Sequence, residues 1–345
     1  MPKDRQLCSV LPEKPAHLLL FSPNWLGDVV MALPAFQQWR TENPNVSVTV
    51  LAKPGVAPLW RWVDGADDIV TLAPGAAGMR DAVRTLRGRA CDAAILLPHT
   101  FRTGWLAWRA GVPSRRGTVG QFRRLLITDP VYLGDFDNRH QQFEIFNLFG
   151  LVPPDPPPAP RLTIPQEALR DAAVQADLQP ERNHIAILPG AARGDSKRWP
   201  AGHFAAAALQ ISRVRADVHF LICGTTAEAT PCALVASALG GRATNLAGKT
   251  RLPTLAAILA QCAAVCCNDS GGMHLATAAG TPVVAVFGLT DPAKTGPLGP
   301  AARVIAPEGV KVSRAIPRRS PAAVRALASV PPESVAAALL EILAP

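Results

Sequence analysis

The chain contains a glycine turn with three polar side chains, placed between two apolar runs. Asp269, Ser270 and His274 lie in residues 268–282, between the runs 263–267 and 283–287. A strand, a glycine turn and a short helix direct backbone N–H groups and the positive end of the helix dipole toward one point. This order predicts an anion-binding turn. A glycine turn alone is a weak signal, because most tight strand-to-helix connections favour glycine.

A second loop, residues 189–200, follows another apolar run and carries the adjacent cations Lys197 and Arg198 before a proline that begins a predicted helix. The two cations could hold a phosphate or could simply be solvated. The length of the loop and its glycines slightly favour phosphate binding.

A third loop, residues 22–28, ends in Gly27 and Asp28 at the start of a predicted helix. Gly27 permits a tight turn. An aspartate at this position caps the helix and complements its dipole, so spacing alone favours capping over catalysis.

The elements that position these loops alternate between strands and helices, which is typical of parallel sheets covered on both faces. We expect an α/β protein with two Rossmann-like, doubly wound domains facing a cleft, with ligands at the carboxyl ends of the strands. The Pro-rich segment 156–165 is the expected linker between domains 1–155 and 166–345. In the first domain we expect strands at 17–22, 46–52, 69–72 and 93–97, and helices at 28–42, 57–63 and 78–87. In the second we expect strands at 184–188, 218–223 and 244–246, and helices at 201–213, 228–239, 253–260 and 334–344.

Composition limits the possible partners and compartment. The 345 residues carry a net charge of +9, which favours anionic substrates or anionic membrane surfaces. Nucleic acid is disfavoured, because basic residues are not interleaved with aromatic ones. No apolar run reaches the ~20 residues of a membrane span, and residues 1–14 lack a secretory signal, so we expect a cytoplasmic protein. The seven cysteines are expected to be reduced core thiols rather than metal ligands.

Arginines concentrate in two clusters, for which a solvated basic face and a binding role are about equally plausible. The first cluster is Arg109, Arg115, Arg116, Arg123 and Arg124, and the second is Arg314, Arg318, Arg319 and Arg325.

Together, the three loops resemble the lipopolysaccharide heptosyltransferases that use ADP-heptose, which form glycosyltransferase family 9. The resemblance covers roughly residues 18–299, and its form is closest to the branch that adds the second heptose. The chain departs from that branch after Pro300, where it becomes rich in Ala, Pro and Arg and lacks a cysteine-containing loop. The matching segments are 24–34 (NWLGDVVMALP), 188–191 with 197–200 (LPGA, KRWP), and 268–274 with 287–292 (NDSGGMH, FGLTDP).

This resemblance implies a GT-B fold, whose N-terminal domain binds the acceptor and whose C-terminal domain binds the nucleotide sugar. It implies that Asp28 is the general base and that Lys197 contacts the donor phosphates. It implies that the final helix packs back on the first domain, and that no metal or other cofactor takes part. The donor-binding residues would be Asp269, Ser270, Gly271, Gly272 and His274, with Glu228 as a candidate for the ribose hydroxyls. The candidate contacts to an anionic glycolipid at the inner membrane face would be Arg115, Arg116, Arg123 and Arg124.

The expected function is therefore inverting transfer of L-glycero-D-manno-heptose from ADP-heptose to the lipopolysaccharide inner core. Kdo-lipid A and heptosyl-Kdo-lipid A are both possible acceptors. One alternative is a family 9 transferase that uses another nucleotide sugar in surface polysaccharide synthesis. Another is a catalytically silent sugar-nucleotide-binding protein, which would have no need of a general base.

Overall fold

The computed structural model describes residues 15–133, 139–156, 158–299, 301–313 and 316–344. The chain divides into two compact units, Met1–Pro158 and Ala159–Pro345, and the division falls inside the expected linker. Cys8, Arg314 and the segment 1–14 lie outside the described residues.

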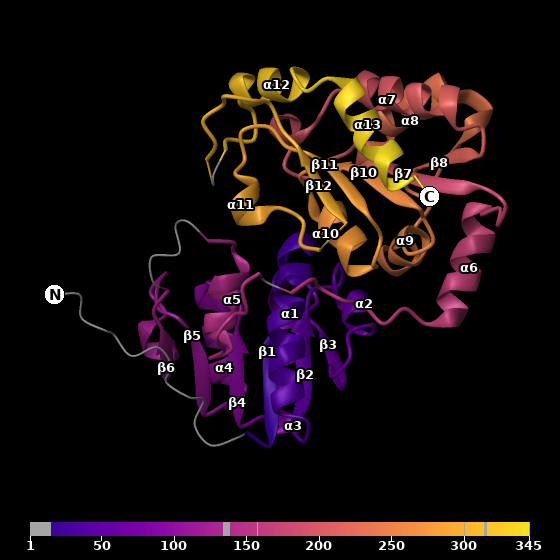
Figure 1. Cartoon of the computed structure of the whole chain (residues 1–345). Coiled ribbons are helices and arrows are strands. Elements are labelled where there is room, and N and C mark those ends of the chain that lie inside the picture. Colours follow the sequence, from indigo (N-terminus) through magenta and orange to yellow (C-terminus); the bar gives the residue numbers. More distant parts are fainter. Residues whose placement is uncertain (1–14, 134–138, 157, 300, 314–315, 345) are drawn as a thin grey trace. The chain divides into compact units, whose positions relative to one another are not determined.

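Unit 1 contains a six-stranded parallel sheet with the strand order β3-β2-β1-β4-β5-β6 (Figure 1). The order reverses between β1 and β4, so the loops that follow these two strands are neighbours at the switch point of the sheet. The strands are β1 (His17–Phe21), β2 (Ser47–Ala52), β3 (Asp68–Thr71), β4 (Ala93–Leu96), β5 (Ser114–Thr118) and β6 (Asp129–Val131). The helices are α1 (Leu26–Glu42), α2 (Ala57–Trp60), α3 (Gly75–Arg89), α4 (Phe101–Arg109), η1 (Arg124–Leu126) and α5 (Gln142–Leu148).

Both faces of this sheet are covered, which explains why β1 is apolar without alternation. Leu19 packs into a cluster with side chains of α3 and α4. On α1, Phe36 meets Trp60 edge to face at 5.6 Å between ring centroids and lies 6.3 Å from Phe149. Aromatic packing of this kind adds to the burial energy of the side chains.

Unit 2 repeats the architecture with a second six-stranded parallel sheet, in the order β12-β11-β10-β7-β8-β9. Its switch point lies between β7 and β10 (Figure 1). The strands are β7 (Asn183–Leu188), β8 (Val218–Ile222), β9 (Ala243–Asn245), β10 (Ala264–Asn268), β11 (Val283–Val286) and β12 (Ala302–Ile305). The helices are α6 (Gln166–Ala176), η2 (Asp195–Lys197), α7 (Ala201–Val214), η3 (Thr226–Glu228), α8 (Ala229–Leu239), η4 (Gly240–Arg242), α9 (Leu252–Leu259), α10 (Gly271–Ala278), α11 (Pro292–Thr295), α12 (Pro321–Ala328) and α13 (Pro332–Ile342).

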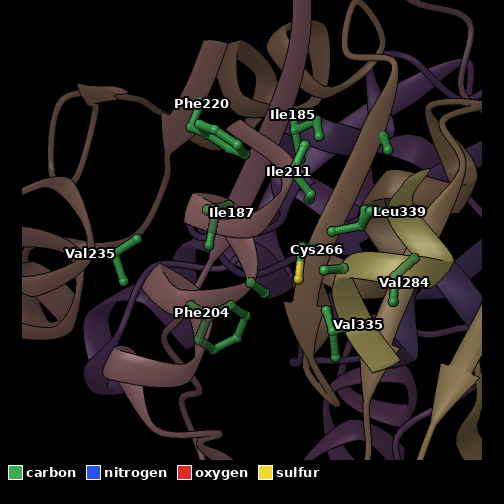
Figure 2. Packing of buried hydrophobic residues seen from close by; sticks show 14 of the residues in the cluster. Ile185, Ile187, Phe204, Ile211, Phe220, Val235, Cys266, Val284, Val335 and Leu339 are labelled. Carbon is green, nitrogen blue, oxygen red and sulfur yellow. The ribbon is translucent and has the colours of Figure 1, made fainter. Parts of the chain in front are cut away.

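The core of unit 2 lies between the sheet and the helices α7, α8 and α13. Figure 2 shows Ile185 and Phe220 of the sheet with Phe204 of α7 and Leu339 of α13. The buried face of α13 is therefore occupied within unit 2, and packing of this helix on the first domain stays a prediction. Among the described residues, no single helix is long and apolar enough to cross a bilayer. The helices α12 and α13 reach that length and apolar composition only when taken together, and they are bent by 57° at the break between them.

The six described cysteines are unpaired and buried, as expected for core thiols. Burial raises the pKa of Cys266 to about 12 and is the main cause that raises the pKa of Cys91 to about 11. A thiol with a raised pKa is mostly protonated at neutral pH and is a poor nucleophile and metal ligand.

Most expected elements are present with ends shifted by a few residues, but the sequence did not predict α4, β5, β6 and α5 in unit 1. For β5 the reason is that Arg115 and Arg116 occupy strand positions that are usually apolar. Their guanidinium groups are buried because the fold supplies hydrogen-bond acceptors, which no hydrophobic pattern reveals.

Candidate active site

The switch point of unit 2 brings two of the three predicted loops together. The loop with Lys197 follows β7, and the turn with Asp269 and Ser270 follows β10, the strand paired directly with β7. In doubly wound sheets, ligands bind outside the carboxyl ends of the strands at this place.

Asn268, the last residue of β10, fastens these loops to each other. Its side chain is fully buried and donates to the carbonyl oxygens of Pro189 at 2.9 Å and Gly190 at 3.2 Å. Its Oδ1 accepts from the backbone N–H of Trp199 at 2.8 Å. Sequence reasoning missed Asn268 as a site residue. The signal that could have found it is an amide side chain at the end of an otherwise apolar buried strand, where polar groups need partners.

Lys197 and Asp269 form a buried ion pair, with 2.5 Å between Nζ and Oδ2. Their side chains are 14% and 7% exposed. The sequence predicted a site role for each residue but not that they contact each other. Because charges are costly to bury, removal of either partner would leave an uncompensated buried charge and destabilise the fold.

The helix α10 begins directly after this pair, with Ser270 as its N-cap residue. Ser270 has extended backbone angles and its side chain makes no capping hydrogen bond. Gly272 lies against Leu188, so that a Cβ at this position would approach Leu188 Cδ2 to 2.4 Å. The turn therefore places the N–H groups of the first helical residues next to the Lys197–Asp269 pair, and anion binding by these groups stays a prediction.

Two other candidates for donor binding, His274 and Glu228, also lie in unit 2. His274 is 5% exposed within α10, and its contact with a donor stays a prediction. Glu228 completes a capping box, in which its Oε2 accepts from the backbone N–H and the hydroxyl of Thr225, both at 2.8 Å. Glu228 also lies against Gly190, at the carboxyl edge of the sheet. Its binding of ribose stays a prediction beside this capping role.

Asp28 lies in the first turn of α1, after the Trp25 N-cap, and is half-buried. The N-cap residue makes no side-chain capping bond, and Asp28 itself is engaged in at least one polar or electrostatic interaction. The position of Asp28 suits stabilisation of the helix dipole. It also lies after β1, at the switch point of unit 1, where ligands of doubly wound sheets bind.

A family model described as glycosyltransferase family 9 (heptosyltransferase) matches residues 79–317, more than half of the chain. The chain belongs to glycosyltransferase family 9. It is 29% identical to lipooligosaccharide heptosyltransferase 2 of Haemophilus influenzae over 306 residues, which cover 84% of this chain and 88% of that protein. It is 28% identical to lipopolysaccharide heptosyltransferase 2 of Escherichia coli, covering 84% and 87%.

The solved structure of the E. coli ADP-heptose lipopolysaccharide heptosyltransferase II matches with a TM-score of 0.83 and 26% identity, over 95% of this chain and 98% of that one. The family resemblance and the fold class predicted from the sequence are confirmed. This family 9 member is an α/β protein with the GT-B fold and two Rossmann-like domains.

The first arginine cluster of this family 9 member is largely structural. Arg115, which is 9% exposed, donates through Nε to the carbonyl oxygen of Leu126 at 2.7 Å. Arg116, which is 2% exposed, bonds through Nη1 with Asp129 at 2.5 Å and through Nε with the carbonyl oxygen of Leu148 at 2.8 Å. These contacts explain both residues as parts of the fold, and the geometry does not support their predicted contact with an acceptor.

Arg123 is fully buried. It donates to the carbonyl oxygens of Thr118 and Pro98, both at 2.7 Å, and to the Thr118 hydroxyl at 2.6 Å. Burial lowers the pKa of Arg123 to about 10. Its geometry does not support the predicted acceptor contact either. Arg124 is exposed and donates to the Tyr132 hydroxyl at 2.8 Å, so acceptor binding by Arg124 stays a prediction.

We expect Arg123→Ala to lower the free energy of unfolding by about 2–3 kcal/mol, because it removes several buried hydrogen bonds to carbonyl and hydroxyl oxygens at once. Arg124→Ala removes the same charge from an exposed position and should change stability by no more than about 0.5 kcal/mol. Urea unfolding of both variants measures the difference. Equal losses in the two variants would contradict the structural role of Arg123.

Proposed function

We propose that this chain transfers a heptose from ADP-heptose to the lipopolysaccharide inner core, with inversion at the anomeric carbon. The observation that carries the proposal is the Lys197–Asp269 pair beside the first turn of α10, at the switch point of unit 2. Supporting it are the relatives named heptosyltransferase 2 and the solved structure titled ADP-heptose heptosyltransferase II.

The proposed reaction assigns a task to each residue. The bond between the anomeric carbon and the β-phosphate oxygen of the donor breaks, and the acceptor hydroxyl oxygen forms the new bond to that carbon. Asp28 takes the proton of this hydroxyl. The diphosphate that leaves gains negative charge, which Lys197 and the N–H groups of Gly271 and Gly272 stabilise. We propose that these groups do so without a metal ion or other cofactor.

The direct test is release of ADP by the purified chain, with ADP-heptose as donor and Kdo-lipid A or heptosyl-Kdo-lipid A as acceptor, in the presence and absence of EDTA. We expect release with one of the two acceptors and no effect of EDTA. No release with either acceptor would favour the silent binding protein. Loss of activity in EDTA, recovered with Mg²⁺, would contradict the metal-independent mechanism.

Calorimetric titration with ADP, UDP and GDP tests the nucleotide. The proposal expects the highest affinity for ADP. A preference for UDP or GDP would favour the family 9 alternative that uses another nucleotide sugar.

We further propose that unit 1 binds the anionic cytoplasmic face of the inner membrane, where the lipid acceptor would be found. Residues 93–128 contain six arginines and neither aspartate nor glutamate. Three of these arginines, Arg102, Arg109 and Arg124, are exposed. In this segment Phe101 and Trp108 of α4 are about half exposed, Phe122 is 100% exposed and Leu125 is 94% exposed. Aromatic and apolar side chains among cations are typical of proteins that bind the interface of an anionic bilayer.

The conformation of the loop at Phe122 supports this proposal. Gln121 and Phe122 have φ angles of 47° and 59°, which are unfavourable for residues other than glycine. The buried Arg123 next to them anchors the loop to the protein. The fold therefore holds Phe122 out into solvent at an energetic cost.

We expect Phe122→Ser with Leu125→Ser to weaken sedimentation with vesicles of mixed phosphatidylglycerol and phosphatidylcholine by at least about tenfold, because each side chain contributes about 1.5–3 kcal/mol when buried. Val174→Ser is the matched control, since Val174 is 83% exposed on α6 in unit 2. If the wild-type chain binds vesicles of pure phosphatidylcholine as well as it binds the mixed vesicles, the proposed preference for an anionic membrane is wrong.

A further inference from the structure

The loop that carries Lys197 is joined to the C-terminal part of the chain by a buried serine. Ser196 is 3% exposed. Its hydroxyl donates to the carbonyl oxygen of Pro317 at 2.7 Å and accepts from the backbone N–H of Ser320 at 2.7 Å. Two segments more than 100 residues apart are thereby fixed to each other, and Arg318 and Arg319 of the second arginine cluster are brought to the proposed donor loop.

The close approach of these segments also depends on Gly194. Its φ is +88°, and a Cβ built there would lie 3.3 Å from the carbonyl oxygen of Arg318. Glycine meets both conditions, because it adopts positive φ without strain and leaves room for the neighbouring backbone. The loop is thus built to receive the segment that contains Arg318 and Arg319.

A pocket of about 290 Å³ lies where the two segments meet. Four arginines line it, together with one aspartate and two small residues. The charged residues are Arg193, Arg198, Arg318 and Arg319 with Asp195, which leaves a net charge of +3.

The positive charge in this pocket is mostly uncompensated. Asp195 pairs with Arg198 at 3.1 Å. Arg193, Arg318 and Arg319 form no ion pair with any carboxylate in the described part of the chain. Nε of Arg198 is buried and has no hydrogen-bond partner among the described groups. Guanidinium groups that share a pocket repel one another, and a bound anion would remove the repulsion and supply the missing acceptor.

We propose that Arg193, Arg198, Arg318 and Arg319 form a binding site for a phosphate group of a substrate. A guanidinium group can donate two parallel hydrogen bonds to two oxygens of one phosphate. A net charge of +3 suits a multiply charged anion. The volume is at the low end for small-molecule pockets, as expected for a charged group rather than a whole lipid. The phosphate belongs either to the donor diphosphate or to a phosphorylated acceptor, and only this choice rests on the proposed function.

Calorimetric titration with inorganic pyrophosphate tests the pocket without any sugar. The variant is Arg318→Ala with Arg319→Ala, and both residues are exposed, so that folding should be preserved and thermal unfolding can verify it. The matched control is Arg325→Ala, an exposed arginine on α12 that does not line the pocket. We expect affinity for pyrophosphate to fall by at least about tenfold in the double variant and to remain unchanged in the control.

Titration with ADP, together with the KM values for a phosphorylated and a dephosphorylated acceptor, identifies the source of the phosphate. If the pocket binds the donor, the double variant loses affinity for ADP and its KM for the acceptor is unchanged. If the pocket binds the acceptor, ADP affinity is retained and the KM rises for the phosphorylated acceptor but not for a dephosphorylated one. Either result supports the site.

The proposal is overturned if pyrophosphate affinity in the double variant equals that of the wild type, or if Arg325→Ala lowers it equally. These results would leave the proposed function intact, provided that the wild type transfers heptose. Conversely, a wild-type chain that binds pyrophosphate through the pocket but never releases ADP from ADP-heptose would refute the function and not the pocket.

Discussion

Asp28→Asn is expected to lower the turnover of heptose transfer by about 10²- to 10⁴-fold, the usual contribution of a general base. The amide keeps the size of the side chain but cannot take the acceptor proton. Affinity for ADP should be unchanged, because the residues proposed to bind the donor are all in unit 2. Steady-state kinetics and calorimetry with ADP measure the two effects.

A control is needed because Asp28 also lies in the first turn of a helix, where a carboxylate stabilises the helix dipole by about 0.3–1 kcal/mol. Glu167→Gln removes a carboxylate from the first turn of α6, outside the proposed site. This control should lose a similar small amount of stability and no activity. If Asp28→Asn or Asp28→Ala retains turnover, Asp28 is only a helix-stabilising residue.

Lys197→Met is expected to produce two separate losses. The free energy of unfolding should fall by about 3–5 kcal/mol, because the 7% exposed Asp269 carboxylate is left without its cation. Turnover should fall by about 10²- to 10³-fold, as when one group that stabilises a developing anion is removed. Thermal unfolding and steady-state kinetics measure the two losses.

The double variant Lys197→Met with Asp269→Asn distinguishes the structural role of Lys197 from contact with the donor phosphates. It removes both charges, so stability should return toward that of the wild type. Affinity for ADP should stay as low as in Lys197→Met alone. Recovery of ADP affinity in the double variant would show that Lys197 serves only to neutralise Asp269. Lys53→Met, at an exposed lysine of unit 1, should change neither property.

The place of the proposed donor loops in the fold could be predicted because their signals are local. The glycine turn at Ser270 and the loop with Lys197 each follow an apolar strand, and the carboxyl ends of adjacent parallel strands meet at one edge. The contact between Lys197 and Asp269, 72 residues apart, could not be predicted. Neither could the bonds of Asn268, because an isolated asparagine in a sequence does not indicate its acceptors.

The arginines show the opposite case, in which a local signal misled. Arg115, Arg116 and Arg123 look like surface cations in the sequence, but their donors are used by carbonyl oxygens that only the folded chain brings near. Arg318 and Arg319 belong to the second cluster, for which the sequence left a solvated face and a binding role equally open, and Ser196 brings them to the proposed donor loop. Whether an arginine is structural or available depends on its acceptors, which are set by tertiary structure.

By itself, the sequence determined the α/β class, the two-domain division and the family, because strand runs, turn glycines and the three loops are properties of contiguous residues. Tertiary structure decided which charges are paired, which arginines are buried and which ones share a pocket. The physical reason is that hydrophobic periodicity fixes local elements, whereas the environment of a charge depends on groups from distant parts of the chain.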